Sequence, residues 1–434
     1  MARWRYILIT LVCLFALNVA SLAQERFPPP EFETDYVRPT TTMPQPEQDI
    51  WEYVAAGVLI GALLLAAHLA LKRRSRKAIF ALMLFSLVAF GFIRKGCVCT
   101  VGSVQNVALT AFDPAYAIPI VVLIFFAAPL VVTLFFGRVF CGAVCPLGAI
   151  QDAVLIHPVR VPNWLESSLR LLAYVYLGAG VLFAALGAAF IICQYDPFVG
   201  FFRLGGNWNI LVLGACLLLI GLFVGRPYCR FLCPYGVILR QFSRLSKWRV
   251  TITPNDCIKC RLCEDACPFG AIRAPTEPWP GKEYKIAKVR LAFLLLLFPM
   301  LVAGGAWGGY LLRDSFARMH PQVRLAERVH LEESGEVEGT TDASDAFRTT
   351  GRPSRELYDE AAQIGRRFAI GGAIFGGFVG FIIGGKLLAL AVRRRRSDYE
   401  ADRASCFACG RCYEYCPKEH ERLKLGEKAV VART

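Results

Sequence analysis

Residues 257–272 read CIKCRLCEDACPFGAI, and residues 406–420 read CFACGRCYEYCPKEH. Each has the spacing C-x2-C-x2-C-x3-C-P, in which three evenly spaced thiolates surround one cubane cluster and a fourth cysteine leads into a proline turn. A structural zinc site would need C-x2-C pairs, and it would explain neither the third evenly spaced cysteine nor the proline. The two stretches therefore predict two 4Fe-4S clusters.

The fourth cysteine of each stretch is expected to bind the cluster of the other stretch, as in proteins with two such clusters. The segment between the two stretches is long and largely apolar, so the two halves of the cluster-binding module must meet across a membrane excursion. We predict that cluster 1 is bound by Cys257, Cys260, Cys263 and Cys416 (the cluster-1 cysteines), and cluster 2 by Cys406, Cys409, Cys412 and Cys267 (the cluster-2 cysteines).

The composition indicates a membrane protein. Of 434 residues, 55% are hydrophobic, and the mean hydropathy is +0.44. A helix needs about 20 apolar residues to cross a bilayer. Seven internal segments meet this length or come close to it: 52–71, 78–93, 116–136, 170–192, 207–225, 289–311 and 367–392. We therefore expect an all-α polytopic membrane protein with a small α+β module that holds the clusters.

The net charge of +15 comes largely from short basic blocks beside these segments. Examples are KRRSRK at 72–77, KEYKIAKVR at 282–290 and RRRR at 393–396. Blocks of this kind orient membrane helices, since cytoplasmic loops carry an excess of Lys and Arg. The charge therefore predicts membrane orientation and excludes nucleic-acid binding.

The order of segments predicts the domains and their sidedness. A basic start, an apolar core and Ser-Leu-Ala before Gln24 predict a signal peptide. Alternation of the spans then places both cysteine stretches in the cytoplasm, a reduced compartment that suits clusters rather than disulfides. The predicted domains are a signal peptide at 1–23, a periplasmic lead at 24–50, a five-span core at 51–250, a first cluster-binding half at 251–280, a span at 289–311, a periplasmic loop at 312–366, a span at 367–392 and a second cluster-binding half at 393–434.

The last span has a glycine at every fourth position, which predicts a face for close helix packing. These glycines are Gly372, Gly376, Gly380 and Gly384.

An internal repeat lies within the five-span core. Residues 137–148 (GRVFCGAVCPLG) align with residues 225–236 (GRPYCRFLCPYG), and each string follows an apolar span. Two equal helical hairpins would pack about a pseudo-twofold axis and bring equivalent residues together. The repeat cysteines Cys141, Cys145, Cys229 and Cys233 would then converge on the cytoplasmic side. They form a further metal, iron–sulfur or redox site, or they are small buried residues that mark the span ends.

Three further cysteines are predicted on the outer side. Cys97 and Cys99 precede one repeat unit, and Cys193 occupies the corresponding place in the other. They either bind a metal or cluster near the outer face, or a disulfide joins Cys193 to one of the pair. Both alternatives stay open. Haem is not expected, because the spans hold no pair of histidines for axial ligation.

The paired GR-x2-C-x3-CP strings, together with the two cluster-binding stretches, resemble the membrane-bound polyferredoxins of the NapH and NosR type. The resemblance covers about residues 78–420. It implies a ferredoxin-like module in the bacterial inner membrane that transfers electrons between the quinone pool, or a cytoplasmic donor, and a periplasmic reductase. The chain departs from NosR, because the lead is too short for a covalent FMN domain, and from NapH, because two spans separate its cluster-binding stretches.

These features predict an electron conduit. Quinol would be oxidised in or beside the helical repeat, electrons would pass through the cytoplasmic clusters and the cysteine sites, and an outer redox partner would dock on 312–366. Membrane or cytoplasmic iron–sulfur subunits are further expected partners. Two other functions fit the same residues: a maturation or assembly factor for an exported metalloenzyme, and a redox sensor.

Overall fold

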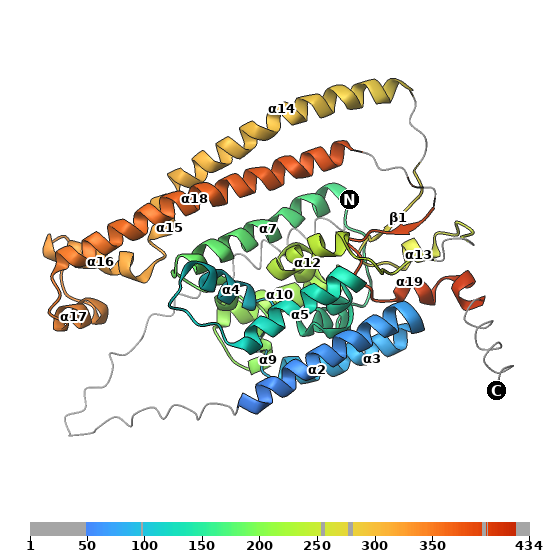
Figure 1. Cartoon of the computed structure of the whole chain (residues 1–434), viewed down its shortest axis with the longest axis horizontal. Coiled ribbons are helices and arrows are strands. Elements are labelled where there is room, and N and C mark those ends of the chain that lie inside the picture. Colours follow the sequence, from blue (N-terminus) through green and yellow to red (C-terminus); the bar gives the residue numbers. More distant parts are fainter. Residues whose placement is uncertain are drawn as a thin grey trace.

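The computed structural model describes residues 49–96, 99–252, 257–276, 281–392, 396 and 398–421, and it is mostly helical. The predicted signal peptide, the lead up to residue 48, Cys97, most of the basic run at 393–396 and residues 422–434 lie outside the described residues. Figure 1 shows a bundle of helices with one long pair, α14 and α18, along one side.

All seven predicted apolar segments contain helices. Five helical segments are long and apolar enough to cross a membrane, whereas α5 (Ile120–Phe136) and α10 (Trp208–Gly221) are apolar but shorter. The protein is therefore a multi-pass membrane protein, with five spans by length where the sequence predicted seven. The long segments are α2 (Asp49–His68) with the π-turn η1 (Leu69–Arg73), α3 (Arg76–Ser86) with η2 (Leu87–Ile93), α7 (Asn163–Ala185), α14 (Gly281–Leu311) and α18 (Ser354–Ala391).

Several helices differ from their predicted ranges, and two of them show why. α7 starts after Pro162, seven residues before the predicted start at 170, and it ends just before Gly187, which has a φ of +68°. Glycine in this conformation commonly closes a helix. α18 starts after Pro353, well before the predicted 367. In both cases the first turns are polar, and hydropathy marks only the apolar part of a helix.

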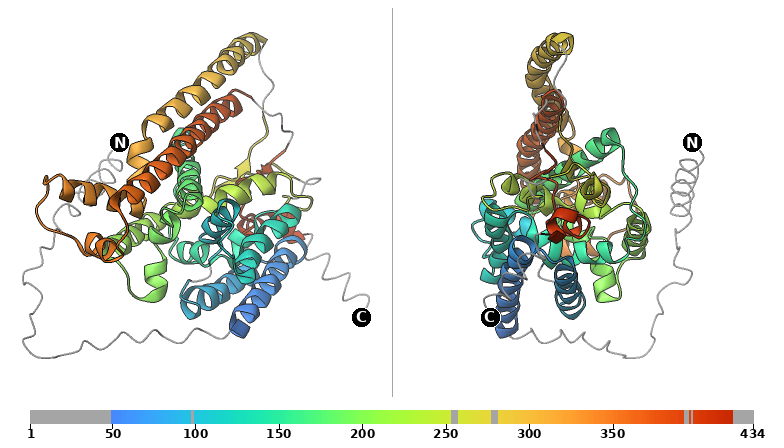
Figure 2. Two further views of the ribbon diagram at one scale, coloured as in Figure 1. Left: turned by 60° about the vertical axis from the view of Figure 1, so that its left-hand side comes forward. Right: turned by 90° about the vertical axis from the view of Figure 1, so that its right-hand side faces the viewer.

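α14 and α18 form an antiparallel pair whose backbones touch along glycines. A Cβ added to Gly372 would lie 2.6 Å from the carbonyl oxygen of Gly309, and one added to Gly376 would overlap the carbonyl oxygen of Gly305. The predicted close-packing face of α18 is therefore confirmed. Its partner glycines on α14 were not predicted. Figure 2 shows this pair standing out from the rest of the bundle.

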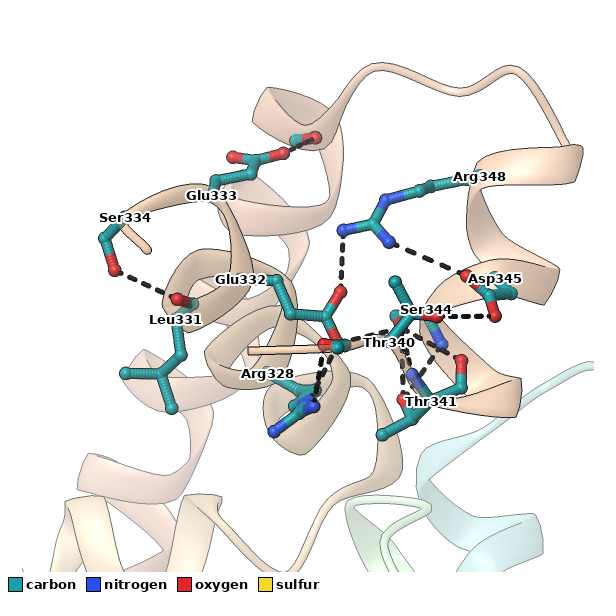
Figure 3. A network of polar contacts seen from close by, with 12 residues as sticks. Arg328, Leu331, Glu332, Glu333, Ser334, Thr340, Thr341, Ser344, Asp345 and Arg348 are labelled. Carbon is teal, nitrogen blue, oxygen red and sulfur yellow. Dashed lines mark hydrogen bonds and ion pairs between the residues drawn. The ribbon is translucent and has the colours of Figure 1, made fainter. Parts of the chain in front are cut away.

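The segment predicted as a periplasmic loop folds as a small helical cap, residues 312–353. Its helices are α15 (Arg313–Ala317), α16 (Pro321–Glu333) and α17 (Asp342–Thr349). Val329 and Phe347 pack with Leu357 of α18 in a small core. Around Glu332, whose side chain is 4% exposed, Arg328, Arg348 and Ser344 donate hydrogen bonds of 2.8, 2.6 and 2.9 Å (Figure 3). These polar contacts and the capping box at Thr341 explain why a charged segment folds.

The two cluster-binding stretches meet in one ferredoxin module, residues 257–276 and 398–421. β1 (Ile272–Arg273) pairs antiparallel with β2 (Glu400–Ala401), with Ile272 opposite Ala401. The short helices α13 (Leu262–Asp265) and α19 (Arg411–Glu414) contact each other. The two stretches thus come together although the segment between them contains α14 and α18.

The two repeat units have the same order of elements, although the short turn is a π-helix in the first and an α-helix in the second. α5 ends at Gly137, with a φ of +73°, and is followed by the π-turn η3 (Phe140–Val144) and α6 (Pro146–Ala153). α10 is followed in the same way by α11 (Pro227–Phe231) and α12 (Pro234–Arg244). Three short helices complete the body: α4 (Ser103–Phe112), α8 (Ile191–Gln194) and α9 (Val199–Arg203).

Candidate metal centres

The four cluster-1 cysteines line a single cavity. Cys257, Cys260, Cys263 and Cys416 surround it, and Ile252 and Tyr399 contribute to its wall. Burial raises the pKa of the Cys263 thiol to about 11, and the nearby Cys416, Cys257 and Cys260 thiols add to the rise. The structure thus brings Cys416 of the second stretch to the three cysteines of the first.

The four cluster-2 cysteines also come together, in a more buried place. Burial raises the pKa of the Cys406 thiol to about 12, and Cys409 and Cys267 add to the rise. The pKa of Cys412 is also raised by burial and by these three thiols. The backbone N–H groups of Ala408 and Ala271 donate to the sulfurs of Cys406 and Cys267, each at 3.4 Å.

Both sets fit an iron–sulfur cluster by their chemistry. Thiols that raise one another's pKa stay protonated on their own. They become thiolates when a metal centre binds them and neutralises their charge. A single ion would need its ligands closer together, and no three Cys, His, Asp or Glu side chains of the described residues form a group that could hold one. The two sets adjoin, because the Cys263 thiol also contributes to the raised pKa of Cys412.

The four repeat cysteines converge as well. Cys145 and Cys233 are the N-caps of α6 and α12, and each is followed by the proline that starts the helix. Cys141 and Cys229 lie one turn earlier, in η3 and α11. All four are buried. Burial raises the pKa of Cys229 to about 11, and the Cys141 thiol adds to the rise. Burial also raises the pKa of the Cys233 thiol, and the other three repeat thiols add to the rise.

Two buried arginines connect the repeat to the ferredoxin module. Arg138, 1% exposed, donates to the carbonyl oxygen of Ala404 at 3.1 Å and lies over the ring of Phe407, 4.3 Å from its centroid. Arg226, fully buried, donates to the carbonyl oxygen of Cys141 and lies 5.6 Å from the centroid of the same ring. Because Phe407 follows Cys406, both cations lie between the repeat cysteines and the cluster-2 cysteines.

A buried carboxylate anchors this junction. Asp152, in α6, forms ion pairs with Arg76 (2.9 Å), Arg226 (3.4 Å) and Arg411 (3.3 Å). These arginines come from a membrane helix, the second repeat unit and the ferredoxin module. They hold the pKa of Asp152 well below its usual value although burial opposes this. A second buried carboxylate, Glu166, forms an ion pair with Arg230 at 2.8 Å. Arg230 also donates a hydrogen bond to the carbonyl oxygen of Pro268.

The predicted outer cysteines are only partly described, because Cys97 lies outside the described residues. Cys99 and Cys193 converge beside Gly102, where an added Cβ would lie 3.5 and 2.7 Å from their sulfurs. Cys99 also lines a small cavity, about 30 Å³, together with Cys145 and Asp196. Burial raises the pKa of this aspartate to about 6.

This shared cavity corrects the prediction that the outer and repeat cysteines lie on opposite faces. A bilayer core is about 30 Å thick, far more than so small a cavity spans. The physical reason is that the chain turns back after α3: α4 packs against α7 and α5 instead of leaving the helical body. Cys99 and Cys145 are therefore near neighbours.

Family models for a "4Fe-4S binding domain" match three parts of the chain. One matches residues 118–162 and 207–253, which contain the two repeat units, and a second matches residues 250–273. NirI of Paracoccus denitrificans is 31% identical over 50% of this chain and 35% of its own length. NosR of Pseudomonas aeruginosa is 34% identical over 32% and 21% of the respective lengths. MauN, a methylamine utilization ferredoxin-type protein of P. denitrificans, is 31% identical over 34% and 54%.

The chain is therefore similar to NosR-type iron–sulfur proteins, and its matched parts are 4Fe-4S binding domains. It spans only about a fifth to a half of the length of these three relatives. No solved structure matches it.

The residues that join the thiol sites were not predicted from the sequence. Two of these residues, Arg138 and Arg226, had a signal in the sequence, because both repeat strings begin with Gly-Arg. Asp152 had no such signal, because its three partners lie far apart in the sequence.

Proposed function

We propose that this protein transfers electrons through iron–sulfur clusters, between the quinone pool or a cytoplasmic donor and a periplasmic respiratory reductase. A general iron–sulfur electron-transfer role follows from the family. The finer proposal rests on one observation, the unbroken series of thiol sites. Cys412 packs against the hydrophobic cluster that contains Cys263. Arg226 donates to the carbonyl oxygen of Cys141 and lies 5.6 Å from the ring of Phe407, and Cys145 shares a cavity with Cys99.

In this proposal the cluster-1 and cluster-2 cysteines each bind one 4Fe-4S cluster, which supplies a one-electron carrier when bound. The protein's own residues hold the thiolates, exclude water from the cluster-2 site and place Arg138 and Arg226 beside it. These cations favour the more negative, reduced state of a centre nearby. We assign the four repeat cysteines to a further metal or iron–sulfur site, which the family match over both repeat units favours over packing alone.

The proposed sidedness has the ferredoxin module in the cytoplasm of a bacterium and the cap in the periplasm, with the spans in the inner membrane. This is supported by Figure 1, where the module and the cap lie at opposite ends of the α14–α18 pair. The basic residues at 393–396 follow α18 directly and favour the cytoplasm for that end. An outer redox partner would then dock on the cap, and iron–sulfur partner subunits on the module.

Anaerobic reduction of the purified protein in detergent tests this function. We expect a menaquinol analogue to produce the EPR signals of reduced clusters, and iron to amount to about twelve per chain if the repeat cysteines bind a third cluster. About eight iron, with unchanged electron transfer in Cys141→Ser, would reduce the repeat cysteines to packing. Signals produced by dithionite but not by the quinol analogue would contradict a quinol donor and favour a cytoplasmic one.

A sensor or a maturation factor is the second candidate, favoured because NosR is named a regulatory protein. Turnover separates the two functions. A conduit must reduce and reoxidise its clusters at least as fast as its partner enzyme works, whereas a sensor or maturation factor works at far lower rates.

A further inference from the structure

A large cavity lies between α18 and the body of the protein, at the end that carries the ferredoxin module. Its volume is about 1540 Å³. Its walls come from α7, α12, the neighbouring ends of α14 and α18, and residues 396–405. None of the described residues that line it is a cysteine. The cavity is therefore separate from the thiol sites.

The charge of this cavity is strongly unbalanced. Nine basic side chains line it, against two acidic ones, Glu400 and Asp402. Three of the basic residues, Arg240, Arg273 and Lys386, come from three different elements, and none of them forms an ion pair with a described residue. The wall thus presents positive charge that the described part of the protein does not neutralise.

Arg240 shows the imbalance most clearly. It is 8% exposed, and its Nε is buried without a hydrogen-bond partner. Burial lowers its pKa to about 9, and the neighbouring cations Arg170 and Arg138 lower it further. A buried cation without a counterion is costly, and a bound anion removes that cost.

Part of the lining is apolar. Phe378, Ile382 and Leu390 of α18 contribute to it, with Leu171 of α7. α18 packs against α7 farther along, where Phe375 and Phe378 approach Gly178, and these contacts hold the apolar wall in place. The cavity therefore combines cationic and apolar lining at the end of α18 that adjoins the ferredoxin module.

We propose that this cavity binds an anionic phospholipid, with its phosphate at Arg240, Arg273 and Lys386 and its acyl chains along α18. Basic pockets between membrane helices recognise such headgroups through charge, and hydrocarbon chains bury the apolar wall. A quinone is a poorer occupant, because its neutral ring does not neutralise these cations. The bound lipid would join α18 to the body where protein contacts are lacking.

The test compares the full-length protein in nanodiscs of phosphatidylcholine alone and with added phosphatidylglycerol. We expect phosphatidylglycerol to raise the unfolding temperature, and native mass spectrometry in detergent to detect one retained phosphatidylglycerol. Arg240→Gln and Lys386→Gln should each weaken retention about tenfold. Lys72→Gln, which removes an exposed cation outside the cavity, should behave like the wild type. The iron content of each variant shows whether it has folded. If Arg240→Gln does not fold, Lys386→Gln alone tests the proposal.

Equal retention of phosphatidylcholine, or unchanged retention of phosphatidylglycerol in both variants, would overturn the proposal. Inorganic phosphate or glycerol phosphate that stabilises the protein as well as the lipid does would identify a soluble anion as the ligand instead. Displacement of the lipid by a menaquinone analogue would make the cavity a quinone site. Each of these outcomes contradicts an anionic phospholipid as the occupant.

Discussion

The cluster-1 and cluster-2 cysteines have the same spacing but very different surroundings. Cys260 of the first set is exposed, whereas Cys409 of the second is buried. Arg76 donates to the carbonyl oxygen of Cys409 at 3.1 Å, and Arg138 lies over the neighbouring Phe407. The repeat also fits closely here, since a Cβ on Gly142 would overlap the carbonyl oxygen of Phe407. The motif selects the cofactor, and contacts with the membrane body distinguish the two sites.

This difference suggests different parts for the two sites. We expect the cluster-1 site, with its exposed Cys260, to exchange electrons with a partner. We expect the cluster-2 site, which packs against the repeat, to pass electrons within the protein. A difference in burial between the cluster-1 and cluster-2 sites should give measurable differences between matched variants.

Serine substitutions of one cysteine in each set should have the largest and the most unequal effects. We expect Cys260→Ser to lose about four iron per chain and to keep the cluster-2 signal. Cys409→Ser should lose more than that, because the buried site holds the module against the repeat. Iron and sulfide analysis with EPR measures both. Equal losses, or no loss in Cys260→Ser, would remove the distinction or the ligand assignment.

Asp152→Asn should destabilise the protein by about 3–5 kcal/mol, because three arginines around a buried carboxylate lose their partner. The matched control is Asp265→Asn, beside the cluster-1 site, whose ion pair with Arg160 is exposed. An exposed pair contributes little. Denaturant unfolding in detergent compares the two variants. Similar, small effects of both would show that Asp152 does not anchor the junction.

Arg138→Gln should lower the reduction potential of cluster 2 by about 40 mV, which corresponds to about 1 kcal/mol for one electron. The cause is the loss of a buried positive charge beside a centre that gains negative charge on reduction. Arg261→Gln, at the exposed cluster-1 site, should have a smaller effect because solvent screens the charge. An EPR-monitored redox titration resolves the two clusters. Equal shifts in both variants would mean that burial does not distinguish the sites.

Local patterns in the sequence predicted much of this architecture. Cysteine spacing grouped eight residues into the two sets that the structure brings together, and hydropathy located the seven apolar helices. The glycine period of α18 predicted its contact face. These features succeed because spacing along a helix or a loop fixes which residues share a site.

Features that depend on distant contacts were not predictable. The three arginines on Asp152 come from separate segments, and the proximity of Cys99 to Cys145 depends on how residues 99–112 turn back. The fold of the cap depends on polar contacts around Glu332 that hydropathy does not detect. Such contacts follow no regular spacing along the sequence from which they could be predicted.

EPR of the fully reduced protein tests the central claim, that cysteines of both stretches build two adjacent clusters. The proximity of Cys263 to Cys412 predicts two clusters, roughly two spins per chain, whose signals broaden or split through magnetic interaction. In Cys260→Ser the magnetic interaction between cluster 1 and cluster 2 should be lost, while the cluster-2 signal remains. Two independent, unbroadened signals in the wild type, or a signal unchanged in Cys260→Ser, would contradict the account.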